Sequence, residues 1–180
     1  MKRNLFFSGM LAVLLAFAVS GCAGTGAPAR MEQGVFPAAD NAGKEAGLKE
    51  VYDFLKGCDN YYLATAEGDQ PRVRPFGSLA IFEGKLYFQT GKIKDVSKQM
   101  AANPKIEICA LNKNGAWIRI QALAVDDPRR EPKQLLIDIQ PGLEKLYSAD
   151  DDNTQVLYLK NAIARFYSFS GTGGPRLIEF

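Results

Sequence analysis

The sequence predicts an α+β domain built on an antiparallel β-barrel with flanking helices. Three observations lead to this prediction. Short segments of β-type composition follow one another at hairpin spacing, which is typical of antiparallel sheets. Three or four segments with helical periodicity lie between them. The chain has 180 residues, of which 47% are hydrophobic and 23% charged, and this suffices for one globular domain with a core of its own.

The folded domain is expected to span residues 44–180 and to begin with an amphipathic helix over residues 44–56. The apolar residues of this segment recur three or four positions apart, as one face of a helix requires: Leu48, Val51, Tyr52 and Leu55. Gly57 follows directly and is a candidate C-cap, because glycine readily adopts the left-handed conformation that ends many helices.

Two strands are predicted next, over residues 61–66 and 72–82, with a turn over residues 67–71 between them. Pro75 and Gly77 interrupt the second strand. Proline lacks the N–H that a strand ladder needs and glycine has no side chain to pack, so the interruption predicts a β-bulge. Bulges often lie beside a ligand, which makes this segment a candidate site.

The rest of the domain alternates hairpins with helices. The predicted elements are a tight turn at 83–85, a strand over 86–90, a helix over 92–102 that ends before Asn103-Pro104, a hairpin of strands 105–111 and 116–125, a helical region over 126–148 with a break at Pro141-Gly142, strands over 155–159 and 162–169, and an edge strand over 175–180. The acidic residues 150–153 lack the spacing of a calcium loop, and no metal site is expected. The glycine-rich residues 170–174 predict a flexible turn, because no helix follows them.

The N-terminus predicts a lipoprotein leader. Two basic residues precede an apolar run over residues 5–19, and the tetrad Val19-Ser20-Gly21-Cys22 resembles a bacterial lipobox. We therefore expect residues 1–21 to be a signal peptide, Cys22 to be the lipidated residue and residues 22–43 to form a flexible tether. The lipid would be the only membrane anchor, and it would place the protein in the cell envelope, facing the periplasm or the cell exterior. The alternative is an ordinary secreted protein with an incidental cysteine.

Composition excludes several classes of function. The chain contains no histidine, so it cannot use a Ser-His-Asp triad, a Cys-His pair, or histidine ligands to zinc or haem. Its net charge of +2 is too small for the positive field that nucleic-acid binding usually requires. Cys58 and Cys109 belong to no CxxC motif and predict no catalytic thiol; they form either a disulfide or two separate buried thiols.

An ordered series of motifs resembles the pyridoxamine 5′-phosphate oxidase-like family, whose members share the FMN-binding split β-barrel. The motifs are YYLAT at 61–65, PRVRPFG at 71–77, GKLYFQTG at 84–91, Asn103-Pro104 and WIRI at 117–120. The resemblance covers about residues 48–170. It implies that the predicted barrel is an antiparallel split β-barrel of the FMN-binding type, and that the protein is a homodimer with FMN between its subunits.

The resemblance also implies which residues hold the cofactor. Arg74 and Thr90 match the residues that contact the FMN phosphate and ribityl chain, whereas the basic residue expected on the following helix falls on Val96. Lys94 or Lys98 would have to take its place. The backbone of the segment after the arginine would run beside the flavin ring, and a tryptophan would approach across the dimer interface. The candidate cofactor-binding residues are Arg72, Arg74, Pro75, Phe76, Gly77, Gln89, Thr90, Lys94, Lys98 and Trp117.

The substrate is expected to differ from that of the family's namesake enzyme. Members that oxidise pyridoxamine phosphate hold it with an arginine and a histidine near the C-terminus, and this chain has no histidine. The resemblance therefore implies a flavin-dependent oxidoreductase of an unidentified small molecule. The alternatives are a non-catalytic module that binds flavin or another small ligand with the same fold, and a structural envelope lipoprotein with an empty barrel.

Overall fold

The computed structural model describes residues 41–169 and 174–180. The predicted leader, the lipidation site at Cys22, the tether and residues 170–173 of the predicted turn lie outside the described residues, and they stay predictions. Within the described part of the chain, no helix combines the length and the hydropathy that crossing a membrane requires.

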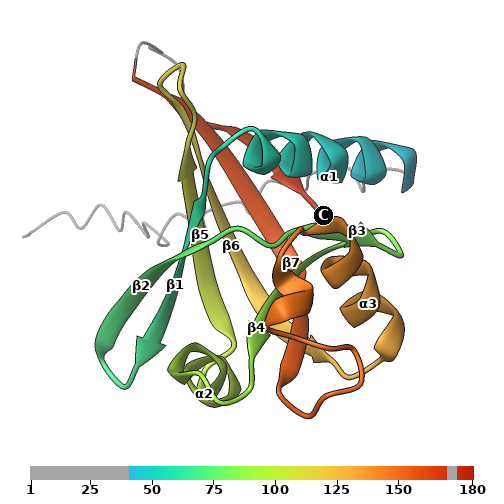
Figure 1. The fold of residues 1–180 in the computed structure, drawn as a ribbon. Helices are drawn as coiled ribbons and strands as arrows, with labels where there is room; N and C mark the ends of the chain where they lie inside the picture. Colours follow the sequence, from blue (N-terminus) through green and yellow to red (C-terminus); the bar gives the residue numbers. More distant parts are fainter. Residues whose placement is uncertain (1–40, 170–173) are drawn as a thin grey trace, which may run out of the picture. The chain divides into compact units, whose positions relative to one another are not determined.

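The described residues form strands and helices that alternate along the chain (Figure 1). The elements are α1 (Asn41–Lys56), β1 (Tyr61–Glu67), β2 (Gln70–Phe76), β3 (Ala80–Phe82), β4 (Lys85–Gly91), α2 (Asp95–Ala102), β5 (Lys105–Leu111), β6 (Ala116–Asp127), α3 (Arg130–Ile139), the 3-10 helix η1 (Leu143–Lys145), β7 (Thr154–Ser168) and β8 (Arg176–Glu179).

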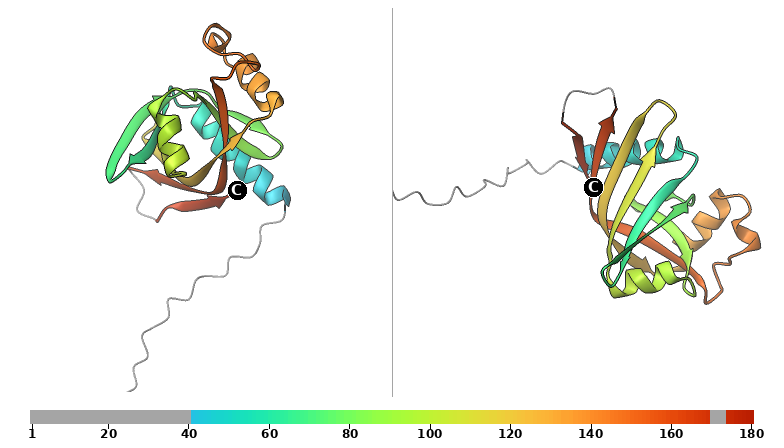
Figure 2. Two further views of the ribbon diagram at one scale, coloured as in Figure 1. Left: turned by 90° about the horizontal axis from the view of Figure 1, so that it is seen from below. Right: turned by 90° about the vertical axis from the view of Figure 1, so that its left-hand side faces the viewer.

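The strands form one antiparallel sheet in the order β2-β1-β5-β6-β7-β4-β3, and β8 pairs with β7. The sheet curls around a common interior (Figures 1 and 2). Because β2 and β3 are the two ends of this order, the barrel is split between them. Helix α2 contacts β1 and β4 at one end of the split, and α1 contacts β3, β4 and β8 at the other. The predicted fold class, an α+β antiparallel split barrel with flanking helices, is confirmed.

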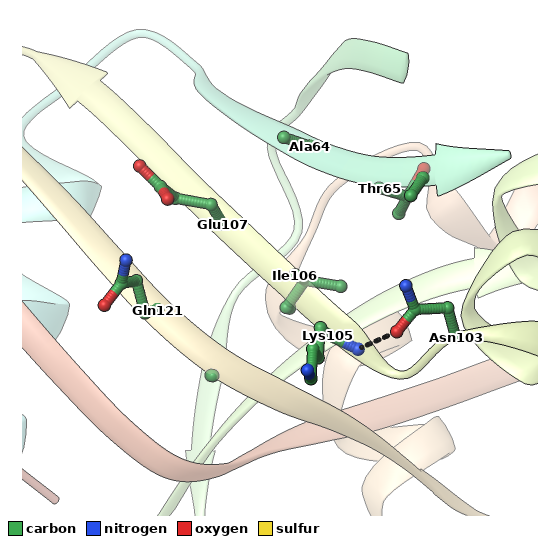
Figure 3. A pocket seen from close by; sticks show the side chains of 9 residues that line it. Ala64, Thr65, Asn103, Lys105, Ile106, Glu107 and Gln121 are labelled. Carbon is green, nitrogen blue, oxygen red and sulfur yellow. Dashed lines mark hydrogen bonds between the residues drawn. The ribbon is translucent and has the colours of Figure 1, made fainter. Parts of the chain in front are cut away.

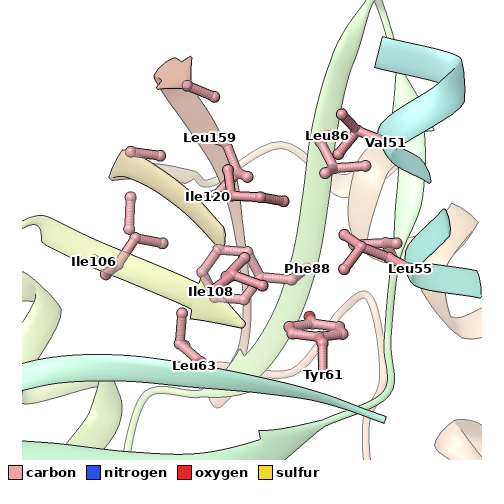
Figure 4. Close-up of a cluster of buried hydrophobic side chains, with 14 of the residues drawn as sticks. Val51, Leu55, Tyr61, Leu63, Leu86, Phe88, Ile106, Ile108, Ile120 and Leu159 are labelled. Atoms are coloured by element: carbon pink, nitrogen blue, oxygen red, sulfur yellow. The ribbon is translucent and has the colours of Figure 1, made fainter. Parts of the chain in front are cut away.

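The barrel interior is filled by apolar side chains from α1 and from strands on every side (Figure 4). The interior forms because successive residues of a strand point to opposite faces of the sheet. In β5, the buried residues are Ile106, Ile108 and Ala110, and the exposed ones are Lys105, Cys109 and Leu111. Each large apolar side chain buried in this way contributes about 1.5–3 kcal/mol to folding. A smaller cluster around Tyr87 and Leu136 packs α3 against the outside of β4.

The predicted bulge at Pro75 to Gly77 is wrong. Strand β2 pairs with β1 in continuous register up to its last residue, with Pro75 opposite Tyr62. An edge strand accepts proline because one of its sides has no ladder to complete, so no bulge is needed. After Phe76 the chain leaves β2, crosses the split through residues 77–79 and enters β3, which pairs with β4 at the other end of the sheet. The interruption therefore marks a crossing between sheet ends.

The two strands predicted over residues 155–159 and 162–169 form one strand, β7. Asn161 has a positive φ of 54°, which asparagine tolerates better than most residues. The register between β6 and β7 shifts at the same level, between Gln121 and Leu123. The polar Lys160-Asn161 pair thus marks a bulge inside one continuous strand, and the predicted break at this point is wrong.

The helical prediction for residues 126–148 holds for a shorter stretch. Strand β6 extends to Asp127, and α3 ends at Ile139, two residues before Pro141. Gly142 then has a φ of 90°, which turns the chain into η1.

Neither alternative predicted for the two cysteines is correct. Cys58 and Cys109 are both free, so they form no disulfide, and Cys58 is half-buried and Cys109 exposed, so they are not a pair of buried thiols.

Candidate functional site

A pocket of about 340 Å³ lies where β2 and β4 face each other across the split. Four segments form its walls: the end of β2 with the crossing that follows, the end of β4, the start of α2, and the chain after α3. The lining residues are Arg74, Pro75, Phe76, Gly77, Ser78, Gln89, Thr90, Lys94, Val96, Gln140, Leu143, Leu146 and Tyr147.

Seven of the ten candidate cofactor residues line this pocket together. They come from segments that are up to twenty positions apart in the chain, and the crossing between the sheet ends brings them into one place. The seven are Arg74, Pro75, Phe76, Gly77, Gln89, Thr90 and Lys94.

The other three candidates lie elsewhere. Arg72 donates to the Glu67 carboxylate at 2.8 Å on the exposed hairpin of β1 and β2. Trp117 stacks on Tyr167 with ring centroids 4.0 Å apart, at the far end of β6 from α2. Lys98 points to solvent, with its side chain 67% exposed, and pairs with Asp95. None of the three lines the pocket of this chain.

The two lysines considered for the missing basic residue lie in different surroundings. Val96 is buried and contributes an apolar wall to the pocket. Lys94, immediately before α2, lines the pocket and has its ammonium 5.6 Å from the centre of the Tyr147 ring. A cation–π contact of this kind orients the ammonium without neutralising it. Of the two lysines, Lys94 is the one that lines the pocket, and its role toward a phosphate stays a prediction.

Arg74 is a cation without an anionic partner. Its Nη1 donates to the Thr65 hydroxyl at 2.7 Å, and its Nη2 donates to the side-chain oxygen of Gln99 at 2.6 Å. No carboxylate within the described residues forms an ion pair with it. Partial burial, together with the nearby charge of Arg72, lowers the pKa of Arg74 from its usual range. The guanidinium stays charged, because arginine keeps its proton at any physiological pH.

Two buried polar side chains in the pocket have unpaired atoms. Gln89 is 5% exposed, and both its amide nitrogen and its amide oxygen have no partner within the described residues. Thr90 is 2% exposed, and its hydroxyl oxygen is also unpaired. A buried polar group without a hydrogen bond costs about 1–3 kcal/mol, so such groups are rare unless a ligand completes them.

The crossing segment is held in place by hydrogen bonds. The buried Tyr61 hydroxyl donates to the Ser78 carbonyl at 2.8 Å, and burial raises the pKa of this phenol far above its usual range. The Ser78 hydroxyl accepts from the backbone N–H of Gln89 at 3.0 Å. The crossing is thereby pinned to both β1 and β4, and this fixes the backbone of residues 75–78 as a rigid wall of the pocket.

Several solved structures are similar to this protein. A NimC/NimA family protein from Clostridium acetobutylicum is 42% identical, with a TM-score of 0.73, over 78% of this chain and 96% of that one. The chain belongs to the NimC/NimA family. General stress protein 26 from Bacillus anthracis is 14% identical, with a TM-score of 0.57, over 76% of this chain and 98% of the other.

A further solved structure supports the fold assignment of this NimC/NimA family member. It is a protein related to general stress protein 26, of the pyridoxinephosphate oxidase family, from Clostridium acetobutylicum; it is 18% identical, with a TM-score of 0.55, over 76% of this chain and 94% of that one. The sequence matches no protein-family model and no curated protein. The fold is thus the split barrel of pyridoxamine 5′-phosphate oxidase-like proteins.

The outer wall of the pocket was missed by sequence reasoning. Gln140, Leu143, Leu146 and Tyr147 all follow α3, in a stretch for which only the Pro-Gly break gave a local signal. The loop after η1 is docked on the connection between β4 and α2. There the backbone N–H of Lys92 donates to the Asn153 carbonyl at 2.8 Å.

The acidic residues of that loop hold its own backbone. Both carboxylate oxygens of Asp151 accept bonds from backbone N–H groups, first that of Thr154 and then those of Ser148 and Asn153, and these bonds lower the pKa of Asp151. Within the described residues, no group of acidic or cysteine side chains has a metal-binding arrangement. This loop therefore supports the outer wall of the pocket in this NimC/NimA family member.

A second pocket, of about 380 Å³, lies on the outer face of β1, β5 and β6 (Figure 3). None of the ten candidate residues lines it. Its acidic side chain, Glu107, forms an ion pair with Arg119, and Asn103 accepts a hydrogen bond from the backbone N–H of Lys105 at 3.2 Å. The side chains of Glu107, Thr65 and Gln121 thus all have partners, whereas those of Gln89 and Thr90 in the pocket at the split have none within the described residues.

Proposed function

We propose that this NimC/NimA family member binds FMN in the pocket at the split and uses it to oxidise or reduce a small molecule. The observation that carries the proposal is the combination of groups in one pocket: an arginine and two buried polar side chains, for which the described residues supply no carboxylate partner and no side-chain hydrogen-bond partner, respectively. Such a combination is complementary to a ligand that has an anionic end and a polar body.

The residues present fit the parts of FMN. The phosphate is a dianion at neutral pH and needs charge-assisted donors, which Arg74 and Lys94 supply. The unpaired groups of Gln89 and Thr90 offer donors and acceptors to the ribityl hydroxyls or to the ring heteroatoms. Phe76 offers a flat apolar surface beside a rigid backbone, as a flavin ring requires.

Bound FMN would supply hydride or single-electron transfer, and the chain would bind it, orient it and keep water from it. Among the described residues, the pocket lining contains no carboxyl, thiol or imidazole group. Its ionisable side chains there are Arg74, Lys94 and Tyr147. Protein side chains would therefore take a limited part in proton transfer, which suits redox reactions better than hydrolysis.

The same observation favours a second candidate function. Because the described lining has no carboxyl, thiol or imidazole group, the pocket would also serve as a non-catalytic module that binds flavin or another small ligand. The two functions differ in turnover. A catalytic protein would oxidise its reduced flavin faster when an acceptor is added, whereas a binding module would reoxidise at the same rate with and without acceptors.

We also propose a homodimer tethered to the cell envelope. The outer face of the sheet carries exposed Tyr62 and Leu111 beside the Trp117–Tyr167 stack, an apolar surface that suits a second copy. Trp117 would then approach the flavin of the partner subunit. Cys22 would carry the lipid. Replacing Cys22 by alanine should release the protein from the membrane fraction, and unchanged fractionation would exclude the anchor.

The visible absorption spectrum tests the proposed function most directly. The domain from residue 41 to the C-terminus is purified, mixed with FMN and freed of excess by gel filtration, which also reports the oligomeric state. Flavin bands that elute with the protein at about one FMN per chain support the proposal. A colourless protein after this treatment would exclude FMN as the ligand.

A further inference from the structure

Gln99 is a buried polar residue to which neither the sequence motifs nor the comparisons assign a role. It lies on the face of α2 that packs on the barrel, between the buried Val96 and Met100, and is itself 7% exposed. Polar side chains in such positions need hydrogen-bond partners. The partners of Gln99 connect it to the site.

The Gln99 side-chain oxygen accepts two short hydrogen bonds. The Thr65 hydroxyl donates one at 2.6 Å, and Arg74 Nη2 donates the other at 2.6 Å. The Thr65 hydroxyl in turn accepts from Arg74 Nη1 at 2.7 Å. Side chains from β1, β2 and α2 thereby close a ring of hydrogen bonds, and the orientation of the guanidinium is set by all three elements.

The ring leaves part of the guanidinium free. A guanidinium has five N–H groups. The two on Nη1 face the Thr65 hydroxyl, the Leu63 carbonyl at 3.3 Å and the Arg72 carbonyl at 3.1 Å. Nη2 uses one N–H for Gln99. The Nε–H and the second N–H of Nη2 have no partner within the described residues. Two N–H groups on adjacent nitrogens are what a bidentate oxyanion contact needs.

The chemistry of the partners also matters. Every acceptor around Arg74 is neutral: two side-chain oxygens and two carbonyls. The guanidinium is therefore oriented while its full charge remains available in a partly buried pocket, where screening by water is weaker. This is the preorganised arrangement that favours binding of an anion.

We propose that Gln99, with Thr65, is a positioning residue that orients Arg74 toward a phosphate, and that it thereby sets the preference of the pocket for FMN over riboflavin. The inference rests on the proposed function and deepens it. Riboflavin has the same ring and ribityl chain as FMN but lacks the phosphate. A residue that acts through Arg74 must change the affinity for FMN and leave that for riboflavin nearly unchanged.

The decisive variant is Gln99→Glu. It keeps the length of the side chain and its acceptor oxygen, but its carboxylate would form an ion pair with Arg74 and cancel the charge offered to the phosphate. We expect the FMN affinity to fall by about tenfold or more and the riboflavin affinity to change less than about threefold. Both are measured by titration of flavin fluorescence.

Two further variants complete the set. Gln99→Met keeps the volume but removes the acceptor, so Arg74 loses one of its supports, and a smaller loss of FMN affinity is expected. The matched control is Gln121→Glu: Gln121 also accepts from an arginine, Arg165, at 2.8 Å, but on the exposed outer face of the sheet. This control should leave the ratio of the two affinities unchanged.

The outcomes separate this inference from the proposed function. A wild-type protein that binds neither flavin overturns the proposed function. A wild-type protein that prefers FMN while Gln99→Glu keeps the same preference overturns the inference alone. Equal losses for both flavins would also overturn it, since they indicate a purely structural role for Gln99. Far-UV circular dichroism verifies folding, and if Gln99→Glu does not fold, Gln99→Met decides by the same ratio.

Discussion

Two arginine clusters of the domain, around Arg74 and around Arg129, hold their guanidinium groups in opposite ways. Arg74 is surrounded by neutral acceptors, whereas Arg129 bonds two carboxylates: Asp127 at 2.8 to 3.2 Å and Glu83 at 2.9 and 3.1 Å. The buried hydroxyl of Tyr87 donates to Asp127 at 2.9 Å and completes the second cluster. The charge of Arg129 is therefore compensated, and that of Arg74 is not.

The positions of the clusters agree with this difference. The Arg129 cluster joins the start of α3 to the turn between β3 and β4, and none of its members lines the pocket at the split. Arg74 itself lines that pocket, and its guanidinium is bonded to Thr65 and Gln99. A compensated arginine adds stability, while an uncompensated one keeps its charge for a ligand. Within one fold, Arg129 is thus a structural cation, and Arg74 is a candidate for binding an anion.

The largest effect is expected from breaking the compensated cluster. Asp127→Ala leaves the buried Tyr87 hydroxyl without an acceptor and removes one of the two carboxylates of Arg129. The free energy of unfolding should fall by about 3 kcal/mol. It is measured by urea unfolding followed by circular dichroism. The FMN affinity of the folded fraction should not change, and a parallel loss of affinity would show that the clusters are not separate.

Breaking the uncompensated cluster should have the opposite pattern. Arg74→Ala should lower FMN affinity by about thirtyfold, or about 2 kcal/mol, since a charge-assisted contact to the phosphate is lost. Its stability should change little. The matched control is Arg72→Ala on the same strand, where the arginine pairs with Glu67 in solvent. FMN affinity in that variant should stay within about threefold of the wild type.

The two lysines beside α2 sharpen the comparison further. Lys94→Ala should weaken FMN binding by about tenfold, because Lys94 lines the pocket and has no carboxylate partner within the described residues. Lys98→Ala should have almost no effect, because its exposed side chain pairs with Asp95. Isothermal titration calorimetry of the two variants measures the difference. Equal effects of the two substitutions would contradict the assignment of Lys94.

The smallest effect is a difference in acid stability. Hydrogen bonds from Arg129 lower the pKa of Asp127 to about 2 from its ordinary value of 3.8. The unfolded chain then binds this proton more tightly than the folded one, so the stabilisation is present above about pH 4 and is lost as the pH falls toward about 2. Between about pH 5 and pH 2.5, the wild type should lose about 1 kcal/mol more than Asp127→Ala.

Urea unfolding at the two pH values checks this difference. Asp150 and Asp151, whose pKa values are also lowered, do not bond Arg129, so they contribute equally to both proteins and cancel in the comparison. The Arg74 cluster has no carboxylate, and it should add nothing to the acid dependence. A difference of zero between wild type and variant would show that Asp127 has an ordinary pKa in the folded state.

Much of the candidate site was predictable because its residues lie in short motifs. Arg74 and the three residues after it form one contiguous motif, and Gln89 and Thr90 end another. Arg72 and Trp117 do not line the pocket of this chain, and the expected approach of Trp117 across a dimer interface stays a prediction. A motif position does not say which face of a strand meets the pocket or whether a neighbouring carboxylate has already engaged the charge.

Local patterns predicted the positions of most strands and helices and all the chemical groups, because two-residue and 3.6-residue periodicities and turn residues are local properties. They also excluded histidine from the chemistry. The continuity of β7, the crossing of the split after Phe76, the presence of Lys94 rather than Lys98 in the pocket and the contact of Gln99 with Arg74 arise from the tertiary structure. These are contacts between residues far apart in the chain, and packing selects them with no signature in the local pattern.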